Sequence, residues 1–176
     1  NSLLLISLFL CQVILSQNVE FKNTNFKNDK DGLKTAKKNI KMGDEYRDEL
    51  IIKVLNMEDA NYKAEKAVFY YKKAQKFNPN NAELNYKLCS SLLFTNRKEF
   101  AKSYIDKANI LSSDIADDFS FYQGMCLQLE GEYGKAIVSY QSFINNAKNK
   151  VKEEYEILTK KFIQECNYAS EVISKE

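Results

Sequence analysis

Two pairs of adjacent carboxylates, Asp117-Asp118 and Glu153-Glu154, are candidates for general acid–base chemistry. Adjacent residues on a helix point about 100° apart, so neither pair could share a reacting atom if these stretches are helical. The chain has no histidine, which removes Ser-His-Asp and Cys-His catalysis and every imidazole metal ligand. We therefore expect no catalytic residue, no metal site and no cofactor, and we assign these carboxylates to helix starts and surfaces.

Three cysteines, Cys89, Cys126 and Cys166, follow the N-terminal segment, and their wide separation excludes a Cys-x-x-Cys zinc or redox motif. Cys89 and Cys126 fall at positions of the helical pattern that require small residues. We expect both to be small buried hydrophobes. A Cys126–Cys166 bridge that pins the last helix is the alternative.

The composition favours long helices, because the 176 residues include one proline and five glycines. The formal net charge of +2 is too small and too evenly spread to indicate nucleic-acid binding. Four lysines at helical spacing form one stripe, Lys34, Lys37, Lys38 and Lys41. We interpret this stripe as a solvated face; a contact for an acidic partner or a lipid headgroup is the alternative.

A pattern of small residues repeats along the chain. The alanines Ala67, Ala101 and Ala136 lie 34 and then 35 residues apart, and large residues such as Tyr71, Ile105 and Tyr140 follow each of them. A period near 34 is typical of tetratricopeptide repeats, which are helix–turn–helix units that stack into a solenoid. The pattern predicts an all-α fold, a TPR-like right-handed α-solenoid of about three helix hairpins with a C-terminal capping helix.

The repeat pattern divides the chain into segments. We expect a signal peptide at 1–16, an extended lead-in at 17–30 and three repeats at about 31–81, 82–115 and 116–149, followed by a capping helix at 150–176. The first helix is expected from about 31 to 50. The first repeat also carries an insertion of about a dozen residues around 51–61, whose apolar residues favour an extension of that helix; a loop is the alternative. Phe21 and Phe26 of the lead-in are expected to dock on the first helices.

Turn residues separate the expected helices. Pro79 in Asn78-Pro79-Asn80-Asn81 blocks helix continuation, and Asn80 with Glu83 predicts a cap for the helix that follows. Ser112-Ser113-Asp114 predicts the next turn and cap. Gly131 is expected to close the third hairpin in a left-handed conformation.

The N-terminal run from Leu3 to Leu15 is almost wholly apolar and ends at Ser16-Gln17. Its length is that of a signal-peptide core and is short for a membrane span. We therefore expect export, cleavage after Ser16 and no transmembrane span in the mature chain; a buried helix of the domain is the alternative. Because Asn1 is not an initiator Met and no basic region precedes the run, residues upstream are expected.

The chain resembles the N-terminal periplasmic tetratricopeptide region of Bacteroidetes OmpA-family proteins that carry a PD40 propeller, a group with type IX secretion and gliding components. The residues that carry this resemblance are Ser16-Gln17, Gly32-Leu33-Lys34, 40–44, 70–86, Gly131-Glu132-Tyr133 and Ile163-Gln164-Glu165-Cys166. The resemblance implies a periplasmic or outer-membrane-associated scaffold. It implies peptidoglycan binding only if an OmpA domain follows, so we expect a fragment of a longer protein or a stand-alone scaffold module.

In the repeat family the first helices line a concave groove that binds a partner protein. The positions carried over to this chain as the partner-binding groove are Arg47, Tyr86, Ser90, Phe94, Phe121, Met125 and Gln128, with Ile40, Asp44, Leu93 and Leu129 beside them. Tyr86 and Ser90 stand where the chaperone-type carboxylate clamp has Lys and Asn, so that specificity is not expected. An apolar and aromatic groove suits a helix or an extended segment of a partner.

These patterns predict a non-catalytic interaction scaffold or adaptor at the cell envelope, in a secretion or gliding assembly, that binds protein partners and no nucleic acid. The alternative is a cytosolic tetratricopeptide co-chaperone or adaptor that keeps its N-terminal helix. The position of the mature N-terminus distinguishes the two.

Overall fold

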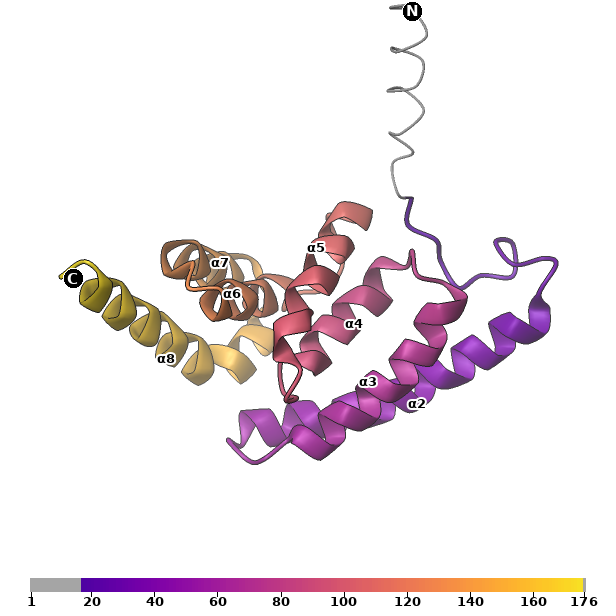
Figure 1. Cartoon of the computed structure of the whole chain (residues 1–176), viewed down its shortest axis with the longest axis horizontal. Helices are drawn as coiled ribbons and strands as arrows, with labels where there is room; N and C mark the ends of the chain where they lie inside the picture. The colour runs from indigo at the N-terminus through magenta and orange to yellow at the C-terminus, as the bar shows by residue number, and fades with distance from the viewer. Residues whose placement is uncertain (1–16, 176) are drawn as a thin grey trace, which may run out of the picture.

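The computed structural model describes residues 17–175, which fold into helices joined by short connections (Figure 1). The expected signal peptide at 1–16 lies outside the described residues. Seven α-helices, one 3-10 turn and no β-strand occur in the described part of the chain, which confirms the all-α prediction. The helices are α2 (Lys30–Leu55), α3 (Asn61–Phe77), α4 (Ala82–Leu92), η1 (Lys98–Phe100), α5 (Ala101–Leu111), α6 (Phe119–Leu129), α7 (Tyr133–Asn146) and α8 (Asn149–Ile173).

Consecutive helices pack in pairs: α2 with α3, α4 with α5, and α6 with α7, while α8 packs along α7. Figure 1 shows the pairs following one another across the molecule, from α2 and α3 at one side to α8 at the other. The first helices also contact each other between pairs, α2 with α4 and α4 with α6. In the described part, no helix is long and apolar enough to cross a membrane.

Small residues lie where the helices of a pair approach each other. The repeating alanines Ala67, Ala101 and Ala136 are fully buried. A side chain at Gly43 would lie 2.4 Å from the Tyr71 ring, and one at Gly124 would lie 2.6 Å from the Tyr140 ring. In the first and the third helix pair, a glycine of one helix thus lies against a tyrosine ring of the other helix.

Replacing Gly124 with alanine is expected to lower the free energy of unfolding by about 1–3 kcal/mol, because the new methyl group overlaps the buried Tyr140 ring. Gly134 is the matched control, since it lies in α7 with no atom within 4 Å of an added side chain. Alanine at Gly134 is expected to raise the unfolding free energy by about 0.5 kcal/mol through helix propensity. Urea denaturation measures both; equal effects of the two substitutions would contradict this packing.

The first helix agrees with the expectation from the sequence, whereas the cap of α4 and the start of α6 differ from it. The first helix continues past Leu50 to Leu55, as the insertion predicted. The cap of α4 is Asn81, whose side chain accepts a hydrogen bond from the Leu84 amide at 2.8 Å, so the expected Asn80 cap is wrong. The first helix of the third pair, α6, begins at Phe119. The segment Ser112-Ser113-Asp114 ends α5 and does not cap α6.

The lead-in docks on the turn between α3 and α4. The Val19 amide donates to the Asn80 carbonyl at 2.7 Å, and the Val19 carbonyl accepts from the side chains of Asn78 and Asn81. The ring of Phe26 lies 4.7 Å from that of Phe77. The Asn-Pro-Asn-Asn turn therefore anchors the lead-in as well as separating two helices, and the predicted docking of Phe26 is confirmed.

Three further sequence predictions have mixed outcomes. Gly131 adopts the expected left-handed backbone, with φ of 76°. In α8, the expected capping helix, Tyr155 and Cys166 are buried, whereas Ile173 is exposed because the end of α8 extends beyond α7 (Figure 1). The alternative Cys126–Cys166 bridge is not formed, since Cys89, Cys126 and Cys166 are buried free thiols.

Candidate functional site

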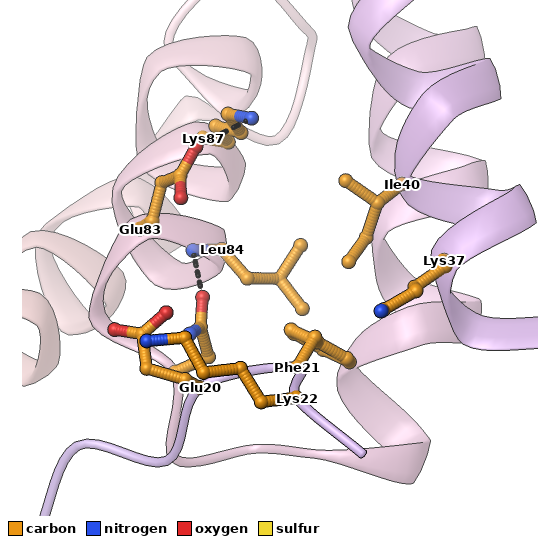
Figure 2. Close-up of a pocket in the computed structure, with 9 residues that line it drawn as sticks. Glu20, Phe21, Lys22, Lys37, Ile40, Glu83, Leu84 and Lys87 are labelled. Carbon is orange, nitrogen blue, oxygen red and sulfur yellow. Dashed lines mark hydrogen bonds and ion pairs between the residues drawn. The ribbon is translucent and has the colours of Figure 1, made fainter. Parts of the chain in front are cut away.

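An open hollow of about 270 Å³ lies between the lead-in, α2 and α4. Figure 2 shows Phe21, Ile40 and Leu84 pointing toward one another across it. Asn81 and five charged residues complete the lining: Glu20, Lys22, Lys37, Glu83 and Lys87. The hollow therefore has apolar walls and both signs of charge around them.

Each wall of the hollow has a local structural cause. Phe21 is held in place because Val19, two residues earlier, is hydrogen-bonded to the turn before α4. Leu84 lies in the first turn of α4, which the Asn81 side chain caps. Ile40 lies on α2, one turn before Gly43, where α2 packs against Tyr71. Rigid elements thus position all three apolar groups.

The charged residues beside the hollow are partly paired. The Lys87 ammonium lies 2.8 Å from the Glu83 carboxylate and 2.9 Å from the Asp44 carboxylate, which also accepts a hydrogen bond from Tyr71 at 2.8 Å. These contacts connect α2, α3 and α4. These ion pairs hold the Lys87 side chain in place. Lys37, in contrast, is exposed on α2 and has no ion pair within the described residues.

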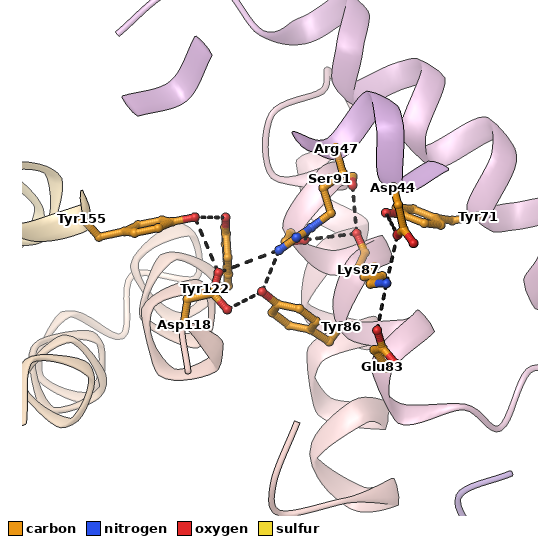
Figure 3. A network of polar contacts seen from close by, with 11 residues as sticks. Asp44, Arg47, Tyr71, Glu83, Tyr86, Lys87, Ser91, Asp118, Tyr122 and Tyr155 are labelled. Atoms are coloured by element: carbon orange, nitrogen blue, oxygen red, sulfur yellow. Dashed lines mark hydrogen bonds and ion pairs between the residues drawn. The ribbon is translucent and has the colours of Figure 1, made fainter. Parts of the chain in front are cut away.

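A second polar cluster lies deeper, around Arg47 (Figure 3). The Arg47 guanidinium donates to the Ser90 hydroxyl at 2.9 Å and to the Tyr86 hydroxyl at 2.6 Å, and it lies 3.8 Å from the Asp118 carboxylate. Tyr86 in turn donates to Asp118. One side chain of α2 therefore links α4 and the start of α6.

The last helix joins the same cluster. The Tyr155 hydroxyl of α8 donates to Asp118 at 3.5 Å and lies 3.0 Å from the Tyr122 hydroxyl of α6. Figure 3 shows Asp118 between Arg47 on one side and Tyr155 on the other. We call Arg47, Tyr86, Ser90, Asp118, Tyr122 and Tyr155 the Arg47 network.

The Arg47 network keeps a buried charge in place. Burial alone would lower the pKa of Arg47, but the tyrosine hydroxyls around it, Tyr86 foremost, and the Asp118 carboxylate raise that pKa above its ordinary value. Every buried side-chain nitrogen or oxygen between residues 17 and 175 has a hydrogen-bond partner. A fully satisfied buried network specifies one arrangement of the helices that supply it.

Buried tyrosines predict a loss of stability at alkaline pH. Burial raises the pKa of Tyr71, Tyr86, Tyr122 and Tyr140, and it raises that of Tyr155 to about 12. The unfolded chain loses these protons near pH 10, whereas the folded chain keeps them. Stability is therefore complete below about pH 10 and falls as the pH rises above it.

Thermal unfolding followed between neutral pH and about pH 11 checks this expectation, with phenolate absorbance recorded in the same samples. We expect the melting temperature to fall above about pH 10 and the absorbance of the buried phenols to rise only on unfolding. Tyr155→Phe should make the fall less steep. Complete phenol ionisation in a protein that stays folded would contradict the burial of these side chains.

The structure brings three of the predicted groove residues together, and all three lie in the Arg47 network. Tyr86 and Ser90 are buried, and the Arg47 side chain is 12% exposed. The prediction that they line an open groove is therefore wrong. Their polar groups bind one another and Asp118 rather than facing solvent.

The other four predicted groove residues are also engaged within the fold. Phe121 is fully buried against the rings of Tyr140, Phe143, Tyr155 and Phe162, so its placement in a groove is wrong as well. The remaining three are half-buried. Phe94 lines a hollow of about 350 Å³ beside α8, Met125 packs against the core, and Gln128 accepts from Tyr140 at 2.8 Å and donates to Glu165 at 3.1 Å.

The expected groove is covered because the first and the last helix contact each other. The insertion lengthens α2 and brings Val54 and Met57 beside Leu158 and Phe162 of α8, around the same hollow that Phe94 lines. The hollow near the lead-in lies between the first helices α2 and α4 and is open. Of its lining, the sequence predicts Ile40 as a groove position and Phe21 as a docking residue. It does not single out Leu84, although the capped turn before α4 marks its place.

The carboxylate pairs lie apart from this hollow. Asp117 forms an ion pair with Lys148 at 3.0 Å, and Asp118 belongs to the Arg47 network. Glu153 and Glu154 are exposed on α8. In the part that the structure describes, no three His, Cys, Asp or Glu side chains are grouped so as to hold a metal ion. The lysine stripe on α2 is exposed along its length.

No protein-family model, no curated protein and no solved structure matches this chain. The family resemblance of the sequence therefore stays a prediction. Any function has to be argued from the geometry of the hollow and of the helices around it.

Proposed function

We propose that this chain is a non-catalytic adaptor that binds a segment of a partner protein in the hollow between the lead-in, α2 and α4. In this proposal the paired helices form a tetratricopeptide-like α-solenoid, and the protein acts at the cell envelope after export, within a secretion or gliding assembly. The partner presents an apolar side chain that contacts Phe21, Ile40 and Leu84. Charged groups on either side of that side chain face Lys37 and Glu83.

The size and lining of the hollow are the observation that carries this proposal. A volume of about 270 Å³ is below the range of roughly 300–1,000 Å³ typical of pockets for drug-sized molecules. One or two apolar side chains of a polypeptide fit such a volume. Apolar pockets surrounded by polar groups are where a few partner residues supply most of the binding energy.

We propose no catalytic role for the acidic residues because they form contacts between helices. Asp117 and Asp118 are engaged in contacts with Lys148 and Arg47 that join different helices. Neither carboxylate lines the hollow. We therefore expect no enzymatic activity that is lost when Asp117 is replaced with asparagine.

Export is supported by the apolar run that ends at Ser16 and by the polar sequence that follows it. We expect the protein isolated from its native cells to begin at Gln17 and to fractionate with the envelope. Mass spectrometry of the intact protein measures the mature N-terminus. A cytosolic protein that retains Leu3–Leu15 would favour the co-chaperone alternative instead.

Site-specific photocrosslinking in native cells tests the binding site. A crosslinking amino acid at Lys37, beside the hollow, is expected to form one dominant covalent adduct with a partner protein. The same group at Asn109, which is exposed on α5 and does not line the hollow, should not form that adduct. Ile40→Gln in the same background should abolish it, because the apolar contact is lost.

The matched control is Ile110→Gln, since Ile110 is 71% exposed on α5. This variant should keep the adduct at Lys37. An adduct that forms equally from Asn109, or that survives Ile40→Gln in a protein with an unchanged melting temperature, would refute the proposed site.

A further inference from the structure

Two buried thiols meet where the second helix pair packs on the third. The Cys89 sulfur of α4 lies 3.5 Å from the Cys126 sulfur of α6. Both side chains are at most 1% exposed. The third thiol, Cys166, is on α8, and its sulfur has no cysteine partner within hydrogen-bonding distance in the described residues.

We propose that Cys89 and Cys126 form a disulfide bond that fixes α4 to α6. A disulfide has sulfur atoms about 2.0 Å apart, so the sulfurs need to approach by roughly 1.5 Å for the bond to form. Their present separation is close to van der Waals contact, and no other atom has to be displaced from between them.

The position of the bond gives it a structural consequence. Cys89 lies one helical turn after Tyr86 on α4, and Cys126 lies one turn after Tyr122 on α6. Both tyrosines belong to the Arg47 network, where Tyr86 bonds Arg47 and Tyr122 lies against Tyr155. A covalent link beside these residues would hold the two helices at the spacing that the network requires.

The oxidant required is a disulfide, either oxidised glutathione or a protein disulfide of the thiol oxidoreductase class. The thiolate of one cysteine attacks this disulfide, releases one thiol and forms a mixed disulfide. The second cysteine, as its thiolate, then attacks the mixed disulfide and releases the second thiol. The two cysteines thus lose two protons and two electrons in total, and the oxidant is reduced to two thiols.

Burial decides when this exchange occurs. Burial and the neighbouring Cys126 thiol raise the pKa of Cys89 well above its ordinary value, so little thiolate is present in the closed structure. Exchange is therefore expected while α4 and α6 come together during folding, before the sulfurs are enclosed. The bond depends on the two sulfur positions alone and requires no partner protein.

Refolding in the presence of an oxidant tests the proposal. The full chain is unfolded in denaturant with a reductant, refolded in millimolar oxidised glutathione, blocked with N-ethylmaleimide and digested without reduction. We expect a Cys89–Cys126 linked peptide and an alkylated Cys166 in the mass spectrum. The melting temperature should exceed that of the reduced protein by about 10 °C, because the bond closes a long loop.

Two variants identify the pair. Cys166→Ser should keep both the linked peptide and the rise in melting temperature, whereas Cys89→Ser should lose both. Alkylated Cys89 and Cys126 in wild-type protein refolded with the oxidant would overturn the proposal, and so would a linked peptide that contains Cys166. A Cys89–Cys126 peptide with no reductant-sensitive rise in melting temperature would overturn the claim that the bond fixes the two helices.

Discussion

Replacing Asp118 with alanine is expected to lower the free energy of unfolding by about 3–5 kcal/mol, because the change leaves the buried Arg47 charge without its carboxylate. The Tyr86 and Tyr155 hydroxyls lose their acceptor in the same step. Urea denaturation followed by circular dichroism measures the loss. The double variant Arg47→Met with Asp118→Leu should regain a large part of it, since no unpaired charge then stays buried.

The adjacent Asp117 is the control for this expectation. Its carboxylate pairs with Lys148, whose side chain is 81% exposed, and ion pairs of this kind contribute about 0–1 kcal/mol. Asp117→Ala should therefore have a small effect. Equal losses at the two neighbouring aspartates would contradict the assignment of Asp118 to a buried network.

Replacing Phe121 with alanine is expected to lower the free energy of unfolding by about 3–5 kcal/mol, as is usual when a buried aromatic side chain is removed. Its ring lies within 6 Å, centroid to centroid, of the rings of Tyr140, Phe143, Tyr155 and Phe162. These rings come from α7 and α8, so the cavity would weaken the attachment of the last helix. Thermal and urea unfolding measure the effect.

Phe100 is the matched control, because its side chain is 56% exposed in η1. Phe100→Ala should change the free energy of unfolding by no more than about 0.5 kcal/mol. A Phe121→Ala variant that is as stable as Phe100→Ala but binds the partner more weakly would contradict this account. It would indicate that Phe121 lies on the partner-binding surface, as the repeat pattern predicts.

The helices and their order could be predicted from the sequence because few alternatives satisfy the spacing of its small residues. Ala67, Ala101 and Ala136 mark the helix crossings, and each is buried. The extension of α2 was also foreseeable, since the residues after Leu50 continue an apolar helical pattern. The left-handed conformation of Gly131 was also predicted correctly, because glycine adopts that backbone conformation without steric strain.

The candidate site was less predictable because it depends on contacts between distant segments. A repeat pattern assigns Tyr86, Ser90 and Phe121 to a groove, but it says nothing of whether the last helix returns to the first. Here α2 contacts α8, and this contact encloses the face that those residues share. A hydrogen bond between Arg47 and Tyr86 joins positions 39 apart in sequence, which no local spacing reveals.

The capping residue of α4 and the start of α6 were missed for a related reason. Asn80 and Asn81 are both good caps by residue type, and the choice of Asn81 follows from its contacts with Leu84 and with Val19 of the lead-in. Asp118 precedes α6, yet its side chain makes no capping bond there. Its carboxylate accepts from Tyr86 and Tyr155 instead.

The binding affinity of the crosslinked partner, measured by calorimetry against purified wild-type and variant chains, tests the central claim most directly. If the hollow formed by Phe21, Ile40 and Leu84 is the binding site, Ile40→Gln should weaken binding about thirtyfold, as expected for loss of roughly 2 kcal/mol at a central contact. Ile110→Gln should leave the affinity unchanged. Equal affinities of these two folded variants for the partner would contradict the claim.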